Sequence, residues 1–89
     1  MSVGVDEGML EDLKTASSKT VGTKQTLKAV QAGRAEKVFL ARDVDEYVAR
    51  KIKDTCDTHQ VPIVYVDTMK ELGKACGIDV GAATAAIIK

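Results

Sequence analysis

Short apolar runs alternate with amphipathic stretches, and this alternation restricts the fold more than any other feature of the sequence. Residues 38–41 and 63–66 are runs of four mainly apolar residues, a length typical of buried strands. Between them, apolar residues recur at every fourth position of residues 44–58, which predicts an amphipathic helix. Because a chain that leaves a sheet through a helix must return over that sheet, the pattern predicts helices packed on both faces.

The other segments continue the alternation up to the end of the chain. Apolar spacing and flanking glycines predict a helix at 5–16, a strand at 19–21, a helix at 23–32, a strand at 37–42, a helix at 69–76 and a strand at 83–88. The expected fold is of the α/β class, a three-layer α/β/α sandwich with a four-stranded mixed sheet. The 89 residues are expected to form one domain, 1–89.

The composition argues against several classes of function. No run approaches the roughly 18 apolar residues of a membrane span, and the first residues lack a signal-peptide pattern, so we expect a cytoplasmic protein without membrane contact. Cys56 and Cys76 are isolated thiols and are expected to be buried. His59 is the only histidine, and it is expected to cap a helix or to be solvated. Nucleotide-binding glycine motifs are absent. We therefore expect no enzyme, no metal and no cofactor.

The charges of the chain are separated although they sum to zero. Residues 14–42 hold seven basic side chains against Glu36 alone, a net charge of +6, whereas residues 1–13 carry −4. Such asymmetry predicts a basic face that can bind a polyanion, although a run of charges is more often only solvated surface.

The start of the second expected helix has an unusual charge. Residues 43–46 and 68–71 both fit a capping box, in which acidic or hydroxyl side chains satisfy the first amides of a helix. The helix after Gly22 instead has Lys24 and then Lys28, and a lysine in the first turn opposes the helix dipole by roughly 0.3–1 kcal/mol. Free amides beside lysines form a phosphate site, while the alternative is a solvated helix end capped by Gly22 or Thr23.

A second informative segment lies at residues 77–83, where Ile78 and Val80 stand among glycines and small residues. An unstacked RNA base could pack on such a loop. Ile78 follows Gly77 directly, a position whose side chain usually folds back onto the preceding helix, so Val80 is the better candidate for a contact.

Four segments of the sequence together resemble a known family. These are residues 22–30 (GTKQTLKAV), 70–77 (KELGKACG), 80–83 (VGAA) and 86–88 (AII). In order and spacing they look like the ribosomal protein L-seven-Ae family of kink-turn RNA-binding proteins, with the short stand-alone bacterial members most similar. The resemblance runs from about Ser18 to the end of the chain.

The resemblance implies an α/β domain whose helix start enters the widened major groove of a bent RNA and reads tandem sheared G·A pairs. A loop would support an extruded base. Many archaeal and eukaryotic relatives have Asn-Glu where this chain has Lys24-Gln25, which leaves the base contacts at these two positions open. The implied RNA-binding residues are Gly22, Thr23, Lys24, Gln25 and Lys28 at the helix start and Ile78, Asp79, Val80, Gly81 and Ala82 in the loop.

The hypothesis that follows is a non-catalytic protein, expected to be monomeric, that binds kink-turns in ribosomal RNA or riboswitch leaders and not DNA. A ribosome is therefore a further possible partner. One alternative is a binder of a small phosphorylated metabolite at the Gly22 helix start. Another is a protein-interaction module that uses the acidic residues 6–12.

Overall fold

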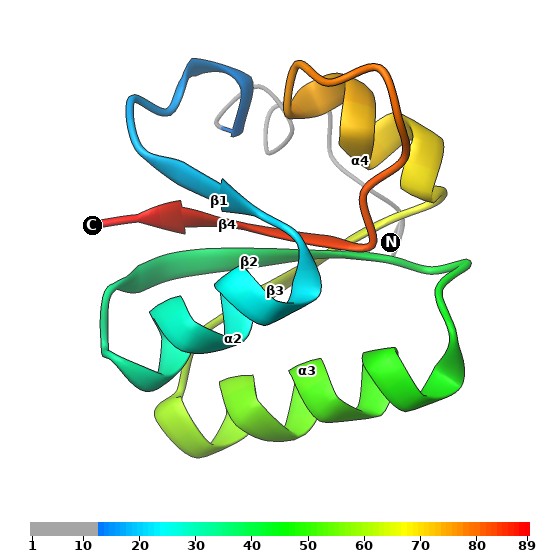
Figure 1. Cartoon of the computed structure of the whole chain (residues 1–89). Helices are drawn as coiled ribbons and strands as arrows, with labels where there is room; N and C mark the ends of the chain where they lie inside the picture. Colours follow the sequence, from blue (N-terminus) through cyan, green and yellow to red (C-terminus); the bar gives the residue numbers. More distant parts are fainter. Residues whose placement is uncertain (1–12) are drawn as a thin grey trace, which may run out of the picture.

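The computed structural model describes residues 13–89 and shows a mixed sheet with helices on both faces (Figure 1). The strands are β1 (Lys19–Val21), β2 (Ala35–Ala41), β3 (Ile63–Val66) and β4 (Thr84–Ile88), and the helices are α2 (Thr23–Gln31), α3 (Glu46–His59) and α4 (Met69–Ala75). The strand order is β1-β4-β2-β3, with β2 parallel to β3 and β4 antiparallel to both β1 and β2. The expected three-layer sandwich with a four-stranded mixed sheet is confirmed.

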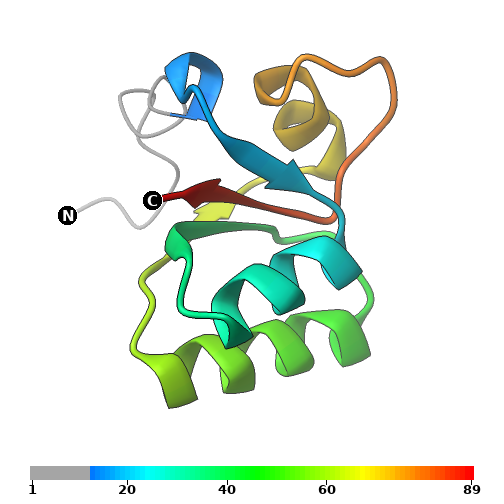
Figure 2. The same cartoon turned by 60° about the vertical axis from the view of Figure 1, so that its left-hand side comes forward.

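Helices α2 and α3 lie on one face of the sheet and α4 lies on the other (Figure 2). Side chains along each strand alternate between the two layers. On β2, Phe39 packs in the layer of α4, while Val38 and Leu40 pack in the layer of α2 and α3. All three are at most 1% exposed. Burial of each such side chain contributes about 1.5–3 kcal/mol, so the sheet is fixed from both sides.

The observed helices and strands differ from the predicted bounds by at most two residues at either end. The stripe predicted for α3 is confirmed, since Ile52 and Cys56 are buried and Val44 and Val48 pack against them. The first helix was predicted over residues 5–16, and residues 13–15 are helical. Residue 16 is not helical, and residues 5–12 of that prediction, which include the acidic residues, lie outside the described residues.

Candidate nucleic-acid interface

Helix α2 begins at a glycine that turns the chain sharply out of β1. Gly22 has φ 106° and ψ 150°, a conformation that strongly favours glycine. Its N–H donates to the Thr84 carbonyl oxygen at 2.8 Å, and its own carbonyl accepts from the Thr26 N–H at 3.0 Å. The helix start is therefore held directly against the beginning of β4.

No side chain caps this helix start, and its first turn contains no acidic residue. The amides of Thr23, Lys24 and Gln25 precede the first intrahelical hydrogen bond, as the first amides of any helix do. Lys24, Gln25 and Lys28 are exposed, and the two lysines stand four residues apart on one side of the helix. Lys24 thus adds positive charge at the positive end of the helix dipole, and Lys28 follows in the last turn of the same short helix.

The other two helices carry conventional caps. Thr68 Oγ1 accepts from the Glu71 N–H at 3.1 Å, which confirms the cap predicted for α4. For α3 the predicted cap was Asp43, and this prediction is wrong. Asp45 caps α3 by accepting from the Tyr47 N–H at 2.8 Å, whereas Asp43 Oδ1 accepts from the Met69 N–H at 2.8 Å and so ties the chain before α3 to the start of α4.

The loop of residues 78–83 is held tightly by α4. Gly77, with φ 80°, ends the helix in a Schellman motif, in which the Ile78 N–H donates to the Gly73 carbonyl at 3.1 Å. The Ala82 N–H donates to the Met69 carbonyl at 3.0 Å. A methyl group on Gly73 would overlap the Val80 carbonyl oxygen, so the loop backbone lies directly on α4 at the glycine of that helix.

Only part of the predicted loop set is available at the surface. Val80 is 70% exposed at the loop tip, and Asp79 and Gly81 are exposed beside it. Ala82 is 4% exposed and its side chain belongs to the core under α4, so it supports the loop from below, and its contact with RNA stays a prediction. Ile78 is half-buried against the same core, as the Schellman position predicts.

The helix start and the loop lie at the same edge of the molecule. The loop leads into β4 near the start of α2 (Figure 1). The first residue of β4 is Thr84, whose buried hydroxyl donates to Thr23 Oγ1 on α2 at 3.4 Å. No sequence pattern marks Thr84 or Gly73 as supports of the interface, because both act through contacts with other segments of the chain. The start of α2 and the loop are therefore connected through the first residue of β4, at one edge of the molecule.

The single histidine and both cysteines of the sequence lie within residues 13–89. His59 is exposed as the last residue of α3. Cys56 and Cys76 are buried free thiols, as predicted, and burial raises the pKa of Cys56 to about 11. In this part of the chain no group of metal-ligating side chains is found, and none of its helices has the length and hydropathy of a membrane span.

Comparison with known proteins adds independent information. A family model described as the ribosomal protein L7Ae/L30e/S12e/Gadd45 family matches residues 7–89. An RNA-binding protein of Caldanaerobacter subterraneus subsp. tengcongensis is 57% identical over 68 residues, which are 76% of this chain and 83% of the relative. An RNA-binding protein of Halalkalibacterium halodurans is 48% identical over 79 residues, 89% of this chain and 96% of the relative.

Two solved structures share the fold. A 15.5-kDa RNA-binding protein of Giardia lamblia superposes with a TM-score of 0.82 at 30% identity, over 91% of this chain and 71% of that one. A protein of unknown function from Bacillus halodurans gives 0.80 at 27% identity, over 91% and 81% of the two chains.

Proposed function

The chain belongs to the ribosomal protein L7Ae/L30e/S12e/Gadd45 family, and we propose that it is a non-catalytic RNA-binding protein that recognises kink-turns and stabilises their bent state. The observation that carries the proposal is the pairing of an uncapped, lysine-flanked start of α2 with the exposed Val80. The names of the relatives, which are RNA-binding proteins, agree with it. Ribosomal RNA and riboswitch leaders are the proposed sources of the kink-turn.

A helix start can read RNA only where the duplex is distorted. The major groove of regular A-form RNA is too deep and narrow for side chains, but a kink opens it. Gln25 offers a donor and an acceptor to base edges, while Lys24 and Lys28 can donate to guanine acceptors or meet phosphates. Val80 would support the extruded base by apolar contact. With lysine at position 24, we expect more of the affinity to come from charge than in relatives with asparagine there.

Stabilisation of the bent state follows from preferential binding. A kink brings phosphates of the two stems together, and this repulsion favours the extended RNA. Cations at the α2 start would offset the repulsion only in the bent form. The protein would therefore shift the RNA toward that form by the ratio of its affinities for the two states.

The test is binding of the wild-type protein to a kink-turn RNA and to a copy whose G·A pairs are replaced by Watson–Crick pairs, each at two salt concentrations. Lys28→Ala should weaken binding and lower the slope of log K against log salt by about one, and Gln25→Ala should reduce discrimination between the two RNAs. Lys51→Ala removes an exposed lysine from α3 and serves as the control.

Equal weak binding to both RNAs that vanishes with salt would refute kink-turn recognition. A rise in melting temperature on addition of a phosphorylated metabolite, without RNA, would then favour the metabolite-binding alternative.

A further inference from the structure

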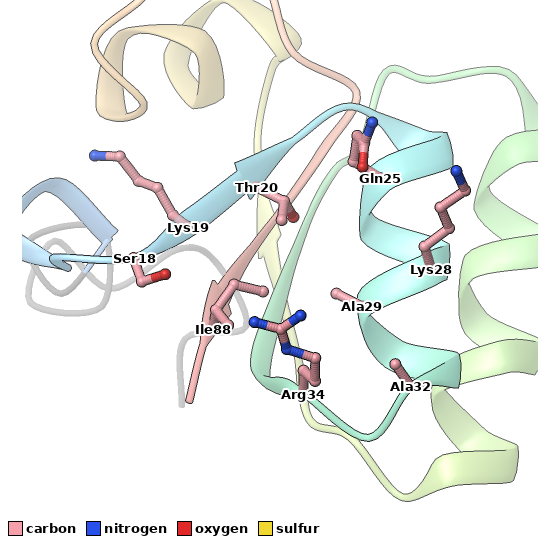
Figure 3. Close-up of a pocket in the computed structure, with 9 residues that line it drawn as sticks. All are labelled: Ser18, Lys19, Thr20, Gln25, Lys28, Ala29, Ala32, Arg34 and Ile88. Atoms are coloured by element: carbon pink, nitrogen blue, oxygen red, sulfur yellow. The ribbon is translucent and has the colours of Figure 1, made fainter.

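A groove of about 400 Å³ lies between β1 and α2 and has no assigned role (Figure 3). It begins beside Gln25 and Lys28, which belong to the proposed interface, and ends at Arg34, just beyond α2. The small side chains of Ala29 and Ala32 line it on the α2 side. The groove is thus continuous with the helix start and leads away from it along the helix.

The charge of the groove has one sign. None of its lining residues is acidic. The ion pairs seen within residues 13–89 do not involve Lys28 or Arg34, so both cations are available to a ligand. Lys19 also borders the groove, but its ammonium group points away from α2 and donates to the Leu13 carbonyl at 3.3 Å (Figure 3). The Lys28 side chain extends along α2 toward the helix start, whereas the Arg34 side chain projects toward Ile88, so Arg34 is the cation that faces the groove (Figure 3).

Arg34 projects from a backbone that is fixed on both sides. Its N–H donates to the Ala29 carbonyl at 2.9 Å, and its carbonyl accepts from the Lys89 N–H at 2.8 Å. The side chain extends from the end of α2 toward Ile88 (Figure 3). A cation on such a rigid base loses little backbone freedom when it binds an anion, and its planar fork suits a phosphate group.

We infer that the groove binds the sugar–phosphate backbone of one of the two stems that flank the kink, with Arg34 contacting a phosphate. The inference rests on the proposed function, because the groove continues the surface formed by Gln25 and Lys28. From Gln25 to Ala32 the helix rises by roughly 10 Å, which is on the order of three phosphates along one strand. One-sign charge over that length suits a polyanion better than a single small anion.

The test compares wild type, Arg34→Ala and Arg50→Ala for binding to a kink-turn RNA with full stems and to versions in which either stem is shortened to the kink. Arg50 is an exposed arginine of α3 that is paired with Glu46, so its variant controls for the loss of one charge away from the groove. Arg34→Ala should bind the full RNA about fivefold more weakly and lower the salt slope by about one. Arg50→Ala should match wild type.

Shortening the stem that occupies the groove should remove the difference between wild type and Arg34→Ala, while shortening the other stem should not. Arg34→Lys should bind the full RNA with most of the wild-type affinity. Ala32→Glu should bind it more weakly than Arg34→Ala does, because it places a carboxylate in the groove. Circular dichroism confirms that each variant is folded.

Two failures are distinguishable. If wild type does not prefer the kink-turn over its Watson–Crick copy, the proposed function is wrong. If wild type shows that preference, two results would show that the groove does not hold a stem. One is that Arg34→Ala binds every RNA with the same affinity as wild type, and the other is that Arg34→Ala loses the same factor in affinity for every stem length.

Discussion

The contact between Gly73 and the loop makes a sharp prediction about stability. Gly73 lies inside α4, where replacement of glycine by alanine ordinarily stabilises a helix by about 1 kcal/mol. Here an added Cβ would lie 3.0 Å from the Val80 carbonyl carbon and 3.1 Å from Gly81 Cα, with the Val80 oxygen closer still, whereas ordinary contact begins at 3.4 Å. The loop backbone would have to move away from the helix.

The expected cost can be built from the contacts that such a movement disturbs. Overpacking against backbone costs about 1–3 kcal/mol. Two hydrogen bonds attach the loop to α4, from Ile78 to Gly73 and from Ala82 to Met69, and each contributes about 0.5–1.5 kcal/mol. After subtraction of the gain in helix propensity, Gly73→Ala should lower the free energy of unfolding by about 1–5 kcal/mol, with about 3 kcal/mol as the central value. For a domain of this size the melting temperature should fall by roughly 10–25 °C.

Urea titration followed by circular dichroism measures the effect, and Gly77→Ala provides the comparison. An added Cβ at Gly77 meets nothing within 4 Å. Gly77→Ala should therefore lower the free energy of unfolding only through the strain of a non-glycine residue at positive φ, which costs about 1–2 kcal/mol. Gly73→Ala should therefore be the more destabilised of the two. Equal or greater stability of Gly73→Ala relative to wild type would refute the argument that the loop is packed on α4.

Three further outcomes are expected. Thr26→Val should raise the free energy of unfolding by about 1 kcal/mol in urea titrations, because the Thr26 hydroxyl is buried without a hydrogen-bond partner; a loss of stability would contradict this. Asp45→Ala should lower it by about 1 kcal/mol by removing the α3 cap, and an unchanged midpoint would show that the cap contributes nothing. The Cys56 thiol has a pKa of about 11 in the folded protein and of 9.0 in the unfolded chain, so the unfolded chain loses this proton at lower pH. The free energy of unfolding should therefore fall as the pH rises from about 9 to 11, and Cys56→Ser should make that decrease smaller.

Most of the fold was predictable because its signals are local. The apolar runs at β2 and β3 and the period of α3 depend on residues two to four positions apart, which share a face whatever the rest of the chain does. Thr68 and Gly77 mark the ends of α4 by the chemistry of one or two residues. The lysine-flanked start of α2 could be recognised in the same way.

Capping at α3 shows where local reasoning stops. Asp43 and Asp45 are the same residue type two positions apart, and either could cap the helix. The Asp43 carboxylate accepts a hydrogen bond from the Met69 N–H, 26 residues away, and Asp45 caps α3. Local reasoning likewise could not place the Ala82 side chain, which is small enough for a surface or a core and is buried in the core.

The sequence by itself determined the helices and strands, the unusual charge at the start of α2 and the apolar character of the loop, since each is a property of neighbouring residues. Tertiary structure alone decided that Thr23 meets Thr84, that the Gly73 backbone accommodates Val80, and that β1 and α2 leave a basic groove ending at Arg34. These features arise where segments distant in sequence pack together. Their geometry depends on the register of the whole sheet, which no short pattern contains.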